Sequence, residues 1–162
     1  MKKVLVISAS DSEIETMKEA VKVLDEFGVE NELTISSAHR SPERTLKLVS
    51  DFAAQDGKII ICGAGLAAHL AGVVAAHFPL PVIGIPLRSG GSGGLDGLDA
   101  FLSTLQMPSG IPVATVAING AKNAGLLAVQ ILATSDSVLE EKMITYKKKL
   151  AEGVEEKAKK LL

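Results

Sequence analysis

Residues 58–85 read KIIICGAGLAAHLAGVVAAHFPLPVIGI. Two short apolar runs, 58–62 and 81–85, have the length and the β-branched content of buried strands. Between them, we expect a glycine turn directly after Cys62 and a helix of small residues from Gly65 to about Ala76. A strand, a helix and another strand in this order indicate two parallel strands joined by a helical crossover.

The same alternation continues in both directions along the chain. Gly28 is a typical helix stop, and Ser41 followed by Pro42 is a typical helix start. Further strands are expected at residues 3–8, 30–36 and 113–118, and further helices at 10–27, from 42 through 52, near 99–105, at 121–133 and at 135–162. Five strands, each followed by a helix, predict a parallel sheet with helices on both faces in a single domain, residues 1–162.

Composition excludes several classes of protein. Of 162 residues, 47% are hydrophobic and 22% are charged, so we exclude a disordered chain. Only 3% are aromatic and the net charge is −2, which argues against nucleic-acid binding by stacking or by a cationic field. One cysteine cannot form an internal disulfide, and no window has the character of a signal peptide or a membrane span. We therefore expect a cytoplasmic protein that does not bind membranes.

Sheets of this kind bind ligands beyond the carboxyl ends of their strands. The segments that follow the predicted strands are residues 8–13, 37–42, 63–69, 90–94 and 119–120. Three of them are rich in hydroxyls, backbone donors, histidine and arginine, so they predict an anion site at this edge of the sheet.

Ser10 and Ser12 precede the first predicted helix. Their hydroxyls, together with the first amides of that helix, can hold a phosphate because a helix N-terminus favours an anion. The alternative is a capping box, in which Ser10 and Glu13 satisfy the donors of the helix itself. Both functions are compatible if Ser10 caps the helix while Ser12 points outward.

The stretch Ser37-Ala38-His39-Arg40 is a second candidate for the anion site. Arg40 can hold a phosphate with two hydrogen bonds, and His39 can transfer protons near neutral pH. The alternative is an exposed polar turn before the helix that starts at Pro42.

Gly63, Gly65 and Ala68 match a loose dinucleotide-binding pattern, but no acidic residue follows between positions 71 and 94 to bind a ribose. We therefore expect the glycines to let the backbone approach a smaller ligand. For His69, a buried structural role and a ligand contact both remain open.

Residues 90–94 contain the pattern G-x-S-x-G of serine hydrolases, yet all three histidines precede Ser92, which is the wrong order for that triad. We interpret residues 90–94 as a flexible loop or lid. One cysteine and three scattered histidines provide no cluster of metal ligands, so no metal is expected, and Cys62 is assigned to the core.

Several stretches, taken together and in one order, are specific to a known family. They are residues 37–42, 64–70, 97–99 running into 106–114, and 123–128. They resemble the N5-carboxyaminoimidazole ribonucleotide mutase family of purine biosynthesis (PurE, class I), also called the catalytic subunit of phosphoribosylaminoimidazole carboxylase. The resemblance covers nearly the whole chain.

This resemblance implies a three-layer, flavodoxin-like αβα sandwich with a long C-terminal helix that packs on a neighbour in a homo-octamer. It implies an isomerase that moves a carboxylate from N5 to C4 of an imidazole ribonucleotide in the synthesis of IMP. No metal or cofactor takes part, CO2 is a trapped intermediate, and an ATP-dependent synthetase is a possible supplier of the substrate.

The resemblance also implies roles for individual residues. Ser12, Ser37 and Arg40 would bind the 5′-phosphate, and His39 would transfer the proton removed from C4. The other expected substrate-binding residues are Ser10, Glu13, Ala64, Gly65 and His69, with the backbone of Ala64 and Gly65 facing the base and the CO2.

The sequence departs from the family pattern at four places. Ala9 replaces a glycine, Glu13 replaces an aspartate that would bind the ribose hydroxyls, and Ala71 replaces a proline; extra residues also lengthen the loop around positions 90–97. Two alternatives remain: a carboxylase that adds CO2 directly to aminoimidazole ribonucleotide, and a non-catalytic nucleotide-binding module, which would not need His39.

Overall fold

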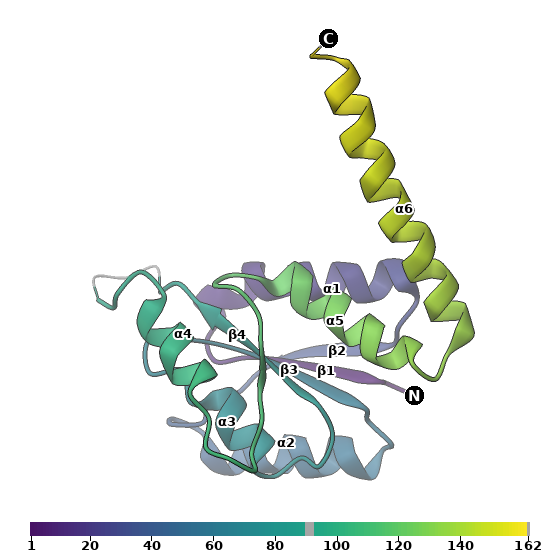
Figure 1. Ribbon diagram of the computed structural model, residues 1–162. Helices are drawn as coiled ribbons and strands as arrows, with labels where there is room; N and C mark the ends of the chain where they lie inside the picture. Colours follow the sequence, from purple (N-terminus) through teal and green to yellow (C-terminus); the bar gives the residue numbers. More distant parts are fainter. Residues whose placement is uncertain (90–92, 162) are drawn as a thin grey trace.

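The five strands of the computed structural model form one parallel sheet with the order β2-β1-β3-β4-β5 (Figure 1). The structure describes residues 1–89 and 93–161. The strands are β1 (Val4–Ser8), β2 (Asn31–Ile35), β3 (Ile59–Gly65), β4 (Val82–Leu87) and β5 (Ala114–Thr115). This strand order is that of flavodoxin-like proteins, so the predicted fold class is confirmed.

Helices cover both faces of the sheet and make the three predicted layers. They are α1 (Ile14–Phe27), preceded by the 3₁₀ turn η1 (Asp11–Glu13), α2 (Pro42–Ala54), α3 (Leu70–Ala75), α4 (Leu98–Leu105), α5 (Ala121–Ala133) and α6 (Ser137–Lys159). Helices α1 and α5 lie on one face, and α2, α3 and α4 lie on the other (Figure 1). In β1, Val4 and Val6 pack in the core under α1 and α5, whereas Leu5 and Ile7 pack in the opposite core. Among the described residues, none of the helices is both long and apolar enough to cross a membrane.

Strand β3 is longer than predicted. The chain does not turn after Cys62, because Gly63 and Gly65 still pair with neighbouring strands. A Cβ added at Gly63 would lie 2.2 Å from Met17 Sδ, so this glycine lets α1 pack closely on the sheet. The predicted glycine turn is therefore wrong, and the helix expected from Gly65 begins only at Leu70.

Strand β5 is shorter than predicted. Residues 113–118 were expected to be extended in the sheet, but only Ala114–Thr115 pair with β4. The carbonyl of Pro86 accepts a hydrogen bond from Asn119 N, so Pro86 faces the fifth strand and has no N–H to offer it. The ladder ends there for this reason.

Helix α6 extends away from the sandwich (Figure 1). It has 23 residues and begins where the Asp136 carboxylate accepts hydrogen bonds from Val138 N and Leu139 N. Only Leu139 and Met143 of this helix are buried. Its exposed apolar residues are Val138, Ile144, Leu150 and Val154. The long C-terminal helix is confirmed, but it spans Ser137–Lys159 rather than the predicted 135–162; Leu162 lies outside the described residues.

Candidate active site

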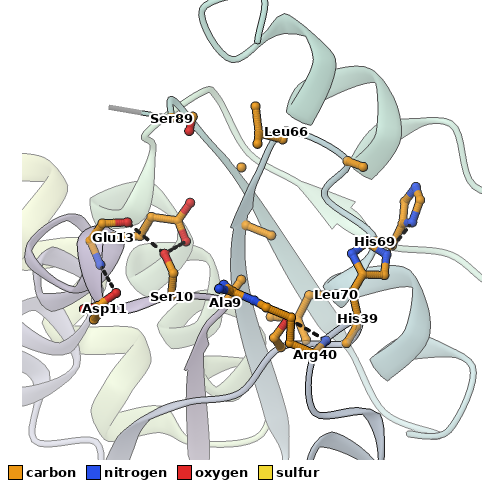
Figure 2. Close-up of a pocket in the computed structure, with 16 residues that line it drawn as sticks. Ala9, Ser10, Asp11, Glu13, His39, Arg40, Leu66, His69, Leu70 and Ser89 are labelled. Atoms are coloured by element: carbon orange, nitrogen blue, oxygen red, sulfur yellow. Dashed lines mark hydrogen bonds between the residues drawn. The ribbon is translucent and has the colours of Figure 1, made fainter. Parts of the chain in front are cut away.

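A cavity of about 570 Å³ opens at the carboxyl ends of β1, β2 and β3 (Figure 2). This is where the chain reverses its direction of growth across the sheet, the expected position for a ligand. All nine predicted site residues line the cavity: Ser10, Ser12, Glu13, Ser37, His39, Arg40, Ala64, Gly65 and His69. The structure thus brings together segments that are far apart in the sequence.

Ser10, Ser12 and Glu13 form a hydrogen-bonded group on the side of β1. The Ser10 hydroxyl donates to Glu13 Oε2 over 2.8 Å and lies 2.9 Å from Ser12 Oγ. Ser10 occupies the N-cap position of η1 but accepts no hydrogen bond from the helix backbone. The capping box is therefore wrong: the turn after Ser10 is a 3₁₀ turn, and the two side chains bond to each other.

The Glu13 carboxylate reaches across to β3. A Cβ added at Gly65 would lie 2.9 Å from Glu13 Oε1 and 3.2 Å from the carbonyl oxygen of Leu87. Gly65 is therefore the residue that lets Glu13 form a wall of the cavity, and a larger residue would displace that wall.

The turn after β2 is held by short-range hydrogen bonds. Ser37 Oγ accepts from Arg40 N over 3.2 Å, and Ser37 N donates to Ser41 Oγ over 3.0 Å. Arg40 is exposed, and its side chain extends across the cavity toward Ala9 (Figure 2). The polar turn of the alternative interpretation is present, and the same turn directs Arg40 to the cavity.

His39 and His69 meet on the other side of the cavity. His39 Nε2 lies 2.9 Å from His69 Nδ1, and the rings are edge to face with centroids 4.9 Å apart. One nitrogen donates and the other accepts, so this contact holds one proton between two imidazoles. His69 is exposed and precedes α3, so the buried structural role is wrong.

The backbone after β3 is tightly held. Leu66 has a φ of 54°, the left-handed region that is unfavourable for leucine. Ser103 of α4 fixes this turn, since its hydroxyl oxygen accepts a hydrogen bond from Ala68 N over 3.0 Å while it donates to Asp99 O of its own helix over 2.8 Å. The expectation that Gly63 and Gly65 let the backbone approach a small ligand stays a prediction: Gly65 lines the cavity, whereas Gly63 does not.

Seven further lining residues were not predicted as site residues: Ala9, Asp11, Ala38, Leu66, Ala67, Leu70 and Ser89. Asp11 and Leu66 lie in segments that the strand-end rule already indicates, and Ser89 follows β4. The predicted loop or lid at residues 90–94 lies partly outside the described residues. At the base of this loop, Arg88 Nε lies 2.7 Å from Asp96 Oδ1.

No group of three or more His, Cys, Asp or Glu side chains is placed to hold a metal ion among residues 1–89 and 93–161. Cys62 is buried in the core, as predicted, and burial raises the pKa of its thiol far above the usual range. This cysteine therefore takes no part in the site.

Comparison with known proteins agrees with this geometry. The AIR carboxylase family matches residues 3–153. The chain is 51% identical over 156 residues to the N5-carboxyaminoimidazole ribonucleotide mutase of Pyrococcus horikoshii, covering 96% of this chain and 86% of that one. It is 50% identical over 156 residues to the phosphoribosylaminoimidazole carboxylase of Schizosaccharomyces pombe, covering 96% of this chain and 28% of that one. A crystal structure of Treponema denticola PurE superposes with a TM-score of 0.87 at 30% identity, covering 98% of this chain and 97% of that one.

Proposed function

Because the chain belongs to the AIR carboxylase family, we propose that it is an N5-carboxyaminoimidazole ribonucleotide mutase of purine biosynthesis. This isomerase moves a carboxylate from the exocyclic N5 of the substrate to C4 of its imidazole ring. The observation that carries the proposal is that the nine predicted site residues line one cavity, with anion-binding groups on one side and a histidine pair on the other.

Ser10, Ser12, Ser37 and Arg40 form what we call the phosphate end of the cavity. The Arg40 guanidinium offers several N–H donors to a phosphate. Ser37 Oγ already accepts from Arg40 N, so its own hydrogen is free to be donated to a phosphate oxygen. Ser12 donates to the phosphate when its hydrogen turns away from Ser10, which is bonded to Glu13.

Glu13 stands between the phosphate end and the base. The longer glutamate, in place of the family's aspartate, has its carboxylate over Gly65 rather than at the helix cap. In that position its carboxylate accepts hydrogen bonds from the ribose hydroxyls once the hydrogen bond from the Ser10 hydroxyl to Glu13 is broken. The substitution therefore keeps the function of the aspartate in a slightly shifted position.

His39, His69, Ala64 and Gly65 form the histidine end. When the N5–carboxylate bond breaks, N5 takes up a proton and CO2 is released; when CO2 adds to C4, the C4 proton leaves. One proton is therefore taken up and one given off in each turnover. His39 accepts the proton that leaves C4, because an imidazole side chain is suited to general acid–base catalysis. The contact with His69 Nδ1 holds the His39 ring in place.

Retention of CO2 between the two steps requires a closed and tightly packed site. The backbone of Ala64 and Gly65 lies against the reacting centre with no side chain long enough to hold the two reactants apart. Aminoimidazole ribonucleotide and CO2 then recombine at C4 before CO2 escapes. Neither step uses a metal or an organic cofactor.

We further propose a homo-octamer in the cytoplasm, in which α6 packs on a neighbouring subunit. The exposed apolar residues of α6, together with Leu98, Leu102 and Leu105 of α4, support this assembly because they are large hydrophobic side chains on the surface. A mass measurement in solution tests it, and a monomer would contradict it. From the family resemblance we also propose that an ATP-dependent synthetase supplies the substrate.

The function is tested with purified protein and N5-carboxyaminoimidazole ribonucleotide as substrate, with and without bicarbonate. A mutase forms the 4-carboxylated product without bicarbonate. A requirement for bicarbonate together with aminoimidazole ribonucleotide indicates the direct carboxylase, and binding without turnover indicates the nucleotide-binding module. Either result would overturn the proposal.

A further inference from the structure

A second hollow, of about 410 Å³, adjoins the phosphate end of the cavity. It shares with the main cavity the residues Ala9, Ser10, Asp11, Ser37 and Arg40. Arg44 lines only the second hollow. Ser10, Ser37 and Arg40 therefore face both spaces, so a phosphate bound at these residues lies on the border between them.

Arg44 is held in place by the edge strand of the sheet. Its Nε donates to the carbonyl oxygen of Ile35 over 3.1 Å, and its Nη2 donates to Thr34 Oγ1 over 3.2 Å. A guanidinium has five N–H donors, so three remain for a ligand. The two bonds to β2 also reduce the conformational freedom that Arg44 would lose on binding one.

The charges around the phosphate end call for a second cation. A phosphate monoester carries a charge of about −1.5 to −2 near neutral pH. Asp11 and Glu13 are acidic, and Arg40 is the one basic lysine or arginine among the described residues lining the main cavity. The side chains of Asp11, Glu13 and Arg40 together carry a net charge of about −1, which opposes the binding of a dianion. When Arg44 is included, two basic side chains offset the two acidic ones.

We propose that Arg44 is a second cationic ligand of the substrate's 5′-phosphate, which then lies between two guanidinium groups. This assignment rests on the proposed function for the identity of the substrate. It predicts a role in affinity and in discrimination for the phosphorylated form, and no role in the chemical steps, because Arg44 is on the far side of the phosphate from the histidine end.

The test compares the wild-type protein with Arg44→Gln, Arg44→Lys and Lys47→Gln. Lys47 is a matched control: it is an exposed cation of α2, pairs with Asp51 at 2.8 Å, and lines neither hollow. Binding of ribose 5-phosphate and of ribose is measured by calorimetry, and KM and kcat are measured with the ribonucleotide at two salt concentrations.

Arg44→Gln is expected to weaken ribose 5-phosphate binding and to raise KM by about three- to tenfold, the range for an exposed charge pair or slightly above it. Its kcat and its affinity for ribose stay unchanged, and its KM depends less on salt concentration than the KM of the wild type. Arg44→Lys retains most of the affinity because it keeps the charge. Both Arg44 variants lose bonds to β2, so a purely structural role would lower their affinity and their melting temperature together.

Equal affinity of Arg44→Gln and wild type for ribose 5-phosphate would overturn the assignment, as would an equal loss in Arg44→Lys or in Lys47→Gln. Absence of ribose 5-phosphate binding to the wild type would also overturn it. If the wild-type protein binds ribose 5-phosphate through Arg44 but does not turn over the ribonucleotide, the proposed function fails while the Arg44 assignment stands.

Discussion

The phosphate end and the histidine end of the cavity are built in different ways. At the phosphate end, Ser10 bonds to Glu13 and Ser37 to the Arg40 amide, so each contact joins residues three positions apart. At the histidine end, His39 and His69 are 30 positions apart and meet only because β2 and β3 both flank β1. Each turn at the phosphate end is held by its own local bonds, although the sheet brings the two turns together, whereas the histidine contact itself joins two segments that only the assembled sheet places side by side.

The difference predicts two kinds of kinetic defect. Changes at the phosphate end should raise KM, because the phosphate is bound equally in the ground state and in the transition state. Changes at the histidine end should lower kcat, because they act on the steps in which bonds are made and broken.

The largest effect is expected from His39→Asn. Loss of the proton carrier should lower kcat by about 10²–10⁴-fold, with substrate affinity nearly unchanged. Steady-state rates and calorimetric binding measure the two quantities. His77→Asn is the control, since His77 is exposed, lies 2.9 Å from the Val73 carbonyl oxygen through Nδ1, and does not line the cavity. An unchanged rate in His39→Asn would refute the catalytic role.

Arg40→Ala should show the opposite pattern. Removal of the guanidinium weakens substrate binding by ~1.5–3 kcal/mol, the range for hydrogen bonds to charged groups, while kcat at saturation is kept. Calorimetry with the ribonucleotide gives the affinity. A fall in kcat with no change in affinity would mean that the two ends are not separate in function.

His69→Ala should have a smaller effect on kcat than His39→Asn. The His39 ring stays but loses the partner that orients it, a loss of about one hydrogen bond or roughly five- to tenfold in rate. Pre-steady-state measurement of the chemical step is the appropriate readout. A loss as large as that of His39→Asn would make His69 a proton carrier in its own right.

Ser12→Ala should give the smallest change, a two- to fivefold rise in KM (about 0.5–1 kcal/mol) for one exposed hydroxyl among several phosphate ligands. Initial rates over a range of substrate concentrations are sufficient to detect it. A change in kcat instead of KM would place Ser12 near the reacting centre.

The comparison between the two ends also shows what the sequence can predict. Alternating apolar runs and helix signals such as Gly28 and Pro42 predicted the sheet and its two layers of helices, because these patterns are local. The predicted glycine turn after Cys62 was wrong because Gly63 stays in the strand and makes room for the side chain of Met17, a contact between elements far apart in sequence. The predicted length of β5 was wrong because Pro86, which has no N–H to donate, lies on the neighbouring strand β4 and not in the stretch from which β5 was predicted.

The site follows the same rule. Its residues could be found because parallel strands bring their carboxyl ends to one edge. The predicted capping box was wrong because the spacing of Ser10 and Glu13 in the sequence does not reveal that the turn between them is a 3₁₀ turn. The contact between the two histidines could not be predicted, because it depends on how the segments after β2 and β3 pack. The hollow that Arg44 lines could not be predicted either, because its other wall, Ala9, Ser10 and Asp11, follows β1.

The most direct test of the account is the fate of the carboxylate carbon. Substrate labelled with ¹³C in the N5 carboxylate is converted in the presence of excess unlabelled bicarbonate, and the product is examined by mass spectrometry. If the cavity holds CO2 beside the ring until it adds to C4, most of the product retains the label. Product that carries the unlabelled carbon of bicarbonate would contradict transfer within the site.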